Sequence, residues 1–544
     1  MNDVKTQPTT PTLIHGLLLG LLLALPWLAA PAPLEAQETP FFGEMVDVRV
    51  INVEAVVSSR GQRLTGLEKK DFRLLVDRAE VPIDFFSEAG APGTSPPAVS
   101  YLVFFDDFFT IPSRRDPALE GLRASLVRLR PQDRMAIVAY DGRRLQVLCP
   151  PTSDRLELQR VLLEAKKRPA YGLQRRSEAS RSFSQLHQLN RPSSGSYTGI
   201  GFDGAARATA FDFEPVQEIF GKVEQLSVAA ASALRGFQGG EGRKVLLLFS
   251  GGVPVGNSDI SLFRDPYRRE LTPFLQASKL YRPLLETANR LGYTVYPVDL
   301  SAEPAAALTS AASASFFDQQ RLREDSLSVK DLNQDLHSQV ASATGGIAIF
   351  GGAGRDVLER VQEDLASYYW LGFKPKWRGD DQAHQLKIEV LRQGAKVRAR
   401  SNFADLSRDA QLDLQVESAH LFDAPLPISS SFAVRAGDPR PAGGARMLVS
   451  TSFEIPADQL SWAKEGDDNV ARPELRIAAT DEFGNAADLP NESIELRLPG
   501  EIQPGQKALY QTTLKLRQRP HRLLIALYDP PSGRLLAQKI SVQP

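Results

Sequence analysis

One apolar segment of this chain ends in the residues with the clearest potential for chemistry. Residues 101–110, YLVFFDDFFT, form an uninterrupted apolar run followed by two adjacent carboxylates, Asp106 and Asp107. Such a run suits a central strand of a parallel sheet that is covered on both faces, and ligands bind beside the carboxyl ends of such strands. The two carboxylates therefore occupy the position of a functional acid. The residues that follow them, Phe108 and Phe109, do not suit most such sites.

Ser250 is a second candidate, because it follows the apolar strand in RKVLLLFSGG. It lies at a strand-to-helix turn, as a hydrolase nucleophile does, but FSGG lacks the glycine that precedes the nucleophile in G-x-S-x-G. The six histidines are scattered, and none pairs with another at metal-ligand spacing. Residues 199–204, GIGFDG, follow a Ser/Gly-rich stretch instead of a strand, which argues against a dinucleotide site.

The elements around these residues alternate between strands and helices. Helical patterns cover 116–129, 215–235 and 354–369, and apolar strands cover 244–252 and 293–300. This alternation predicts a doubly wound, mostly parallel sheet, which we assign to residues 98–372. Two inserts, 166–213 and 301–330, have no convincing period and are expected to be surface excursions or partly disordered.

Strand patterns flank this α/β region on both sides. VDVRVINVEAVV alternates at the start of 44–90, and HQLKIEVLRQGAKVRARSNF reads as a hairpin within 380–404. Forty residues bury too little core to fold alone, so we predict that the two segments complete one β-sandwich into which the α/β domain is inserted. Residues 410–544 carry short strands with regularly spaced turns, which predicts an immunoglobulin-like β-sandwich.

The charge balance of the chain argues against a nucleic-acid partner. The 544 residues carry 64 Lys and Arg against 65 Asp and Glu, which gives no electrostatic reason to expect one.

An apolar segment at 17–30 is short, contains a proline and precedes small residues, so residues 1–36 are expected to be a signal peptide cleaved near Ala36. An uncleaved anchor is the alternative. No later segment is apolar enough to cross a membrane, and we expect a periplasmic or secreted protein in which Cys149, the single cysteine, forms no intrachain disulfide.

Several blocks of the chain resemble the bacterial VWFA-related domain proteins, which are built on the von Willebrand factor A fold. The blocks are GQRLTGLEKKDFRLLVDRAEVPIDFF, DRMAIVAYDGRRLQVLCPPTSD, RKVLLLFSGG, ATGGIAIF and DLASYYWLGFKP, and they run in order from about residue 46 to residue 403. The resemblance implies a metal-ion-dependent adhesion site, in which strand-end and loop oxygens bind Mg²⁺.

The implied metal site is degenerate in this chain. Asp106 matches the leading carboxylate and Thr110 the last hydroxyl, but Phe108 replaces the middle hydroxyl and Ser250 stands where an aspartate is expected. Mg²⁺ requires near-octahedral oxygen coordination and releases its waters reluctantly. We therefore expect no tight metal requirement and no cofactor, with at most weak binding of Mg²⁺.

The resemblance also implies a function in binding a protein partner. Seven Lys and Arg lie between residues 166 and 191 against one Glu, in a loop that emerges beside the ligand face of the fold. This loop is either a solvated, flexible segment or a docking site for an acidic partner. The candidate partner-binding residues are Asp107, Phe108, Phe109, Arg175 and Arg176. We predict a non-enzymatic interaction or adhesion module; the alternative is an exported hydrolase that uses Ser250 or the two strand-end carboxylates.

Overall fold

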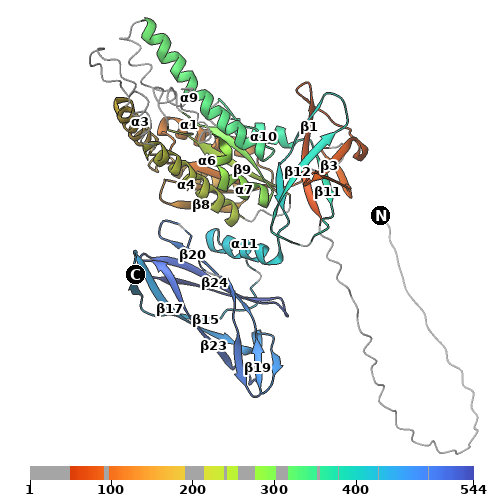
Figure 1. Cartoon of the computed structure of the whole chain (residues 1–544), viewed down its shortest axis with the longest axis vertical. Helices are drawn as coiled ribbons and strands as arrows, with labels where there is room; N and C mark the ends of the chain where they lie inside the picture. Colours follow the sequence, from red (N-terminus) through yellow and green to blue (C-terminus); the bar gives the residue numbers. More distant parts are fainter. Residues whose placement is uncertain are drawn as a thin grey trace, which may run out of the picture. The chain divides into compact units, whose positions relative to one another are not determined.

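The computed structural model describes most of the chain after residue 49 (Figure 1). The described residues are 50–90, 97–189, 214–237, 242–254, 276–301, 316–351, 356–377, 379–424, 426, 428–484, 486–487, 489 and 491–544, without the side chains of 182–189, 214–216 and 316–329. Residues Arg49–Pro544 form one compact unit. The predicted signal segment, 1–36, lies outside the described residues.

A five-stranded sheet forms the centre of the α/β region. Its strand order is β10-β9-β6-β7-β8, with β6 at Val99–Asp106 and β9 at Arg243–Ser250. The pairs β10–β9, β9–β6 and β6–β7 are parallel, and the edge strand β8 is antiparallel to β7. The other strands are β7 (Arg134–Tyr140), β8 (Leu145–Thr152) and β10 (Tyr293–Asp299). The predicted mixed α/β class is therefore confirmed.

Helices cover both faces of this sheet because its central strand is apolar on both sides. Tyr101, Val103 and Phe105 pack on one face with α1 (Pro112–Ser125), η2 (Leu126–Arg128), α2 (Arg155–Ala165) and α10 (Val357–Leu365). Leu102 and Phe104 pack on the other face. The helices of that second face are α3 (Gly172–Leu189), α4 (Glu214–Gly236), α6 (Ala277–Leu280), α7 (Arg282–Leu291) and α9 (Phe316–Ala343).

The strands before and after the α/β region share two sheets. One has the order β13-β1-β11-β5, with β2 paired to β1, and the other has the order β14-β12-β3-β4. Val57 of β1 pairs with Val397 of β13, and Leu74 of β3 pairs with Ile388 of β12. The bounds are β1 (Ile51–Ser59), β2 (Gln62–Arg63), η1 (Lys69–Asp71), β3 (Phe72–Val76), β4 (Ala79–Val81), β5 (Phe85–Ala89), β11 (Tyr368–Phe373), β12 (Ala383–Val390), β13 (Ala395–Arg398) and β14 (Asn402–Ala404).

Two local predictions for this region were wrong. The expected hairpin around Gly394 does not form, because β12 and β13 pair with strands of different sheets. The helix expected up to residue 369 ends at Leu365, and β11 begins at Tyr368. Tyr369 and Leu371 alternate into the core between the two sheets, so tertiary packing favours a strand there.

The last region begins with a helix that the prediction of strands for 410–544 missed. Ser407 caps α11 (Arg408–Leu421) by accepting a hydrogen bond from Ala410 N–H, and Leu412 and Val416 pack against the strands that follow. Those strands are β15 (Ala433–Ala436), β16 (Arg440–Ala442), β17 (Arg446–Pro456), β18 (Ala463–Glu465), β19 (Asp468–Ala471), β20 (Glu474–Asp481), β21 (Glu492–Ser493), β22 (Leu496–Pro499), β23 (Lys507–Arg517), β24 (His521–Asp529) and β25 (Arg534–Val542), with η5 at Ala457–Gln459.

The two inserts, which were expected to be surface excursions or partly disordered, contain helices. α3 begins at Gly172, within the first insert, and α9 begins at Phe316, within the second. Ala179 of α3 is 1% exposed and packs into the core that α4 also lines. Tertiary contact therefore stabilises a segment whose own sequence has only a weak apolar period.

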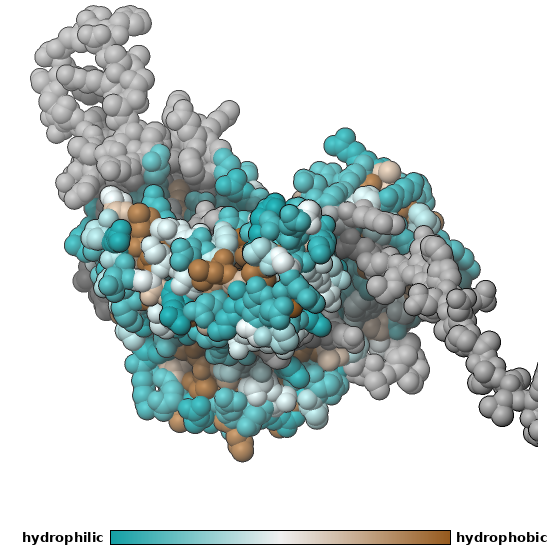
Figure 2. Space-filling model, turned by 90° about the horizontal axis from the view of Figure 1, so that it is seen from below, coloured by the Kyte–Doolittle hydropathy of each residue, from teal (hydrophilic) through white to brown (hydrophobic). Residues whose placement is uncertain are grey.

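The face of the molecule shown in Figure 2 is mainly hydrophilic, with hydrophobic residues in small groups among polar ones. Exposed large apolar side chains include Leu156 and Leu173, which lie on different helices. Isolated apolar residues of this kind are normal on soluble domains. Among the residues that the structure describes, no helix is both long and apolar enough to span a bilayer.

Candidate ligand site at the strand ends

Three parallel strands of the central sheet end in polar residues at the same edge. β6 ends at Asp106, β9 at Ser250 and β10 at Asp299. Asp299 pairs with Ser250 in the register of β10 and β9, and Phe105 pairs with Phe249 in the register of β6 and β9. The carboxyl ends of parallel strands therefore bring Asp106 and Ser250 together, although 144 residues separate them in sequence.

The carboxylate of Asp106 is satisfied entirely by its own surroundings. Oδ1 accepts hydrogen bonds from the backbone N–H groups of Phe108 (3.0 Å) and Phe109 (2.9 Å), while Oδ2 accepts one from Ser250 Oγ at 2.7 Å. The side chain is 1% exposed. The chain turns sharply directly after the strand, and Asp106 holds this turn closed.

Burial changes the pKa of the Asp106 carboxyl. Removal from water raises the pKa of its carboxyl to about 6, although the hydrogen bonds from Ser250 and the backbone favour the charged form and the neighbouring Asp107 disfavours it. Ser250 Oγ donates to this carboxylate and also accepts from the backbone N–H of Gly252 at 3.2 Å. Ser250 is fully buried, so its hydroxyl is occupied by structural hydrogen bonds.

Asp107 faces away from Asp106 and binds two arginines. Its Oδ1 lies 3.2 Å from Arg115 Nη1, and its Oδ2 lies 2.9 Å from Arg168 Nε. Burial raises the pKa of Asp107, and the two arginines act in the opposite direction. The backbone carbonyl of Asp107 accepts a hydrogen bond from Tyr171 N–H at 2.8 Å. Asp107 thus ties the strand end to α1 and to the segment before α3, where it cannot replace a missing metal ligand.

The two phenylalanines after the carboxylates are buried, with Phe108 4% and Phe109 1% exposed. Their rings lie 4.6 Å apart, and the guanidinium of Arg175 lies 4.5 Å from the centre of the Phe108 ring. Gly142 leaves room for Phe108, because a Cβ at that position would lie 2.1 Å from the ring. Phe108 and Phe109 therefore pack beneath the start of α3, and their rings are not available to a partner.

The prediction that Asp107, Phe108 and Phe109 contact a partner directly does not agree with their burial. Asp107 is 1% exposed, like Phe109, so neither side chain can touch a partner in this conformation. Arg175 is partly buried between Phe108 and Glu178, whose Oε2 lies 2.6 Å from Arg175 Nη1. Phe108 and Phe109 belong to the hydrophobic core, together with Ala179 of α3.

Thr110 and Arg176 complete the predicted set. Thr110 is fully buried, and its Oγ1 has no hydrogen-bond partner among the described residues, whereas its carbonyl accepts from Gly172 N–H at 3.1 Å. Burial lowers the pKa of the Arg176 guanidinium, and Asp299 opposes this effect. The structure therefore places Arg176 within electrostatic range of the third strand end.

The sequence analysis did not identify the polar group around Asp299, the last residue of β10. Asp299 Oδ1 accepts from Ser301 N–H at 2.9 Å and lies 3.8 Å from Nδ1 of His337, which is fully buried. Burial lowers the pKa of His337, while Asp299 acts to raise it. Asn333 Oδ1 accepts from Val253 N–H at 2.8 Å. The signal was available, because YTVYPVDL is an apolar strand that ends in an aspartate, as YLVFFD is.

The donor set at this edge suits Mg²⁺ poorly. Of the predicted ligands, Asp106 and Ser250 are hydrogen-bonded to each other, and Thr110 supplies one neutral oxygen. A cation would have to break the Ser250 and backbone contacts of the one carboxylate, and it would gain few oxygens in return. Across the described part of the chain, no group of three or more His, Cys, Asp or Glu side chains is arranged to hold a metal ion.

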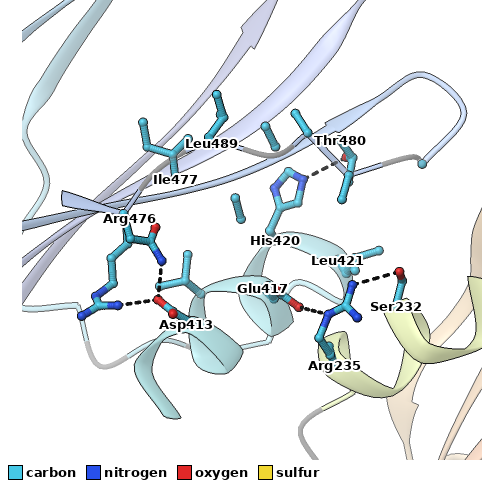
Figure 3. A pocket seen from close by; sticks show the side chains of 17 residues that line it. Ser232, Arg235, Asp413, Glu417, His420, Leu421, Arg476, Ile477, Thr480 and Leu489 are labelled. Atoms are coloured by element: carbon cyan, nitrogen blue, oxygen red, sulfur yellow. Dashed lines mark hydrogen bonds and ion pairs between the residues drawn. The ribbon is translucent and has the colours of Figure 1, made fainter. Parts of the chain in front are cut away.

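A separate cavity of about 190 Å³ lies where α4, α11 and β20 meet (Figure 3). Most polar side chains around it pair with one another: Glu417 with Arg235 at 3.2 Å, and His420 Nε2 with Thr480 Oγ1 at 2.9 Å. Burial lowers the pKa of His420 to about 4. The first pair joins α11 to α4 and the second joins α11 to β20, so few polar groups of the cavity are left for a ligand.

Comparisons with known proteins do not assign this chain to a family. No family model and no curated protein matches it. Among solved structures, the N-terminal domain of TFIIH p34 has a TM-score of 0.18 at 14% identity, with 49% of this chain and 96% of that chain covered. The pilus adhesin SpaC from Lactobacillus rhamnosus GG has a TM-score of 0.23 at 8% identity, with 86% of this chain and 60% of the adhesin covered. TM-scores this low carry no argument about fold or function.

Proposed function

We propose that the chain is an exported, non-enzymatic protein-interaction module with a von Willebrand A-like domain whose metal site is degenerate. One observation carries the proposal: both carboxylate oxygens of Asp106 are used by Phe108, Phe109 and Ser250 within the protein. In a metal-dependent adhesion site that carboxylate binds the ion, which in turn binds the partner. Here three hydrogen bonds within the protein occupy the carboxylate oxygens that would otherwise bind the ion.

Because the aromatic pair is buried, we propose that a partner contacts the exposed residues of α3 instead. Phe108 and Arg175 fix the first turns of α3, and the exposed side chains of these turns include Leu173, Gln174 and Arg181. Leu173 is 64% exposed. A partner surface made of one apolar, one amide and one basic side chain suits an acidic protein with an apolar contact point.

A pull-down experiment tests whether a partner binds at α3 without a metal ion. The mature wild-type protein, immobilised, is used to capture partners from the exported proteome with and without EDTA, next to Leu173→Asp and Leu156→Asp. We expect the same captured proteins with EDTA, their loss with Leu173→Asp, and no change with Leu156→Asp, which alters a side chain of α2 that is 76% exposed. Capture that requires a divalent cation, or that both variants abolish equally, contradicts the proposal.

The competing proposal is a hydrolase, and the 2.7 Å contact of Ser250 Oγ with Asp106 Oδ2 is the observation in its favour. A carboxylate with a pKa near 6 can accept a proton from a hydroxyl that attacks a substrate. Full burial of Ser250 argues against this reaction. Turnover of simple ester substrates that Ser250→Ala abolishes would favour the enzyme over the interaction module.

A further inference from the structure

A cavity of about 370 Å³ lies at the opposite end of the central sheet, where β9 and β10 begin. Its wall includes Glu54 of β1, the first two residues of β9, and Arg400, which follows β13. β9 has eight residues, so the cavity lies roughly 25 Å along the sheet from Ser250. It is therefore independent of the strand-end site and of the function proposed for it.

Arg243 lines this cavity and also a neighbouring one beside Tyr368. It is 2% exposed, and its Nη2 lies 2.6 Å from Glu54 Oε2, while its Cζ lies 4.3 Å from the centre of the Tyr368 ring. Its Nε and Nη1 are buried and have no hydrogen-bond acceptor among the described residues. Unsatisfied donors on a buried guanidinium are costly, so these nitrogens point to an acceptor that the described protein groups do not supply.

Apart from Glu54, the other charged side chains of the cavity are cations. Arg398 is paired, because its Nη2 lies 2.5 Å from Asp364 Oδ1, a carboxylate that also binds Arg63. Lys244 and Arg400 have no carboxylate partner among the described residues: Lys244 Nζ lies 3.5 Å from Leu291 O, and Arg400 Nη2 lies 2.6 Å from Asn52 O. Burial, with the positive charge of Arg400, lowers the pKa of Lys244.

We infer that this cavity binds the phosphate group of a small ligand through Arg243, Lys244 and Arg400. Among the described residues, Glu54 pairs with Arg243 alone of these three cations, which leaves two positive charges for a dianion to neutralise. A phosphate dianion matches that charge and accepts several hydrogen bonds at once, whereas a monocarboxylate neutralises one charge. The volume also leaves room for a small organic group attached to the phosphate.

Isothermal titration calorimetry on the mature protein, in a chloride buffer free of other oxyanions, tests the inference with inorganic phosphate, glycerol 3-phosphate and acetate. We expect phosphate to bind with a dissociation constant below about 1 mM and acetate to bind more weakly. Tighter binding of glycerol 3-phosphate than of phosphate identifies a phosphate ester as the ligand. Equal binding of the two identifies the free ion.

Two variants and a matched control locate the binding. Arg243→Gln breaks a buried ion pair and can prevent folding, so Lys244→Gln and Arg400→Gln are the test variants. Each is expected to weaken phosphate binding roughly tenfold or more, the effect of losing one charge-assisted contact. Lys396→Gln alters an exposed cation of β13 that does not line the cavity, and it is expected to change the affinity less than about twofold. Absence of binding to the wild type, equal affinity for acetate, or unchanged affinity in both test variants overturns the inference.

Discussion

The Asp106→Asn substitution should make the protein more stable at neutral pH. The carboxyl has an ordinary pKa of 3.8 and a folded-state pKa of about 6, because burial penalises its charge. The folded state therefore binds a proton more tightly than the unfolded state does, and stability falls as pH rises from about 4 to about 6 and stays low above that range. A difference of about two pKa units corresponds to about 3 kcal/mol, at about 1.36 kcal/mol per unit.

Asparagine removes the charge and keeps most of the contacts. Its Oδ1 can still accept from the N–H groups of Phe108 and Phe109, while the hydroxyl of Ser250 loses its charged acceptor. The lost hydrogen bond costs about 1 kcal/mol, which leaves a net gain of about 2 kcal/mol at pH 7.5 and no gain at pH 4. For the α/β domain this corresponds to a rise in Tm of roughly 4–8 °C.

Scanning calorimetry of both proteins from pH 4 to pH 8 is the appropriate assay. The difference between variant and wild type isolates Asp106, because other groups titrate equally in both. Ser250→Ala is the matched control: it removes a contact that favours the charged carboxylate, so it should lower Tm at pH 7.5 and have less effect at pH 4. If Asp106→Asn lowers Tm at pH 7.5, or if the two pH profiles run parallel, the buried carboxylate is compensated by something else, such as a cation, and the reasoning fails.

Three further outcomes follow from the same contacts. Addition of millimolar Mg²⁺ or EDTA should move the Tm of the wild type by less than about 1 °C, since a hydrated Mg²⁺ finds too few free oxygens at the strand ends; a rise of several degrees that Asp106→Ala abolishes would show a working metal site. Asp107→Asn should lower the free energy of unfolding by about 1–3 kcal/mol, because it removes the carboxylate that Arg115 and Arg168 share, while Arg115 keeps its contact with Asp116 at 2.9 Å; a loss below about 0.5 kcal/mol in denaturant titrations would contradict this. His420→Gln should remove a loss of stability that the wild type shows as pH falls from 6.5 towards 4, since the folded-state pKa of about 4 lies below the ordinary value and only the unfolded state takes up the proton in that range; calorimetric profiles of identical slope would refute it.

The sequence predicted best those elements whose burial follows from the apolar pattern of adjacent residues. The run YLVFF became the central strand β6, because side chains that are apolar on both faces require a cover on both faces. The position of Asp106 at the end of that strand also followed from the sequence. The helices in the two inserts did not, because α3 is held by contacts to α4 and to Phe108, and its own apolar pattern is weak.

The sequence alone determined which residues lie at the strand ends, and the tertiary structure decided what those residues do. Asp106 and Asp107 are neighbours in the chain, yet one binds a serine 144 residues away and the other an arginine 61 residues away. The cationic cavity likewise joins residues of β1, β9 and the segment after β13. Apolar periodicity is a property of adjacent residues, whereas compensation of a buried charge depends on groups that only folding brings together.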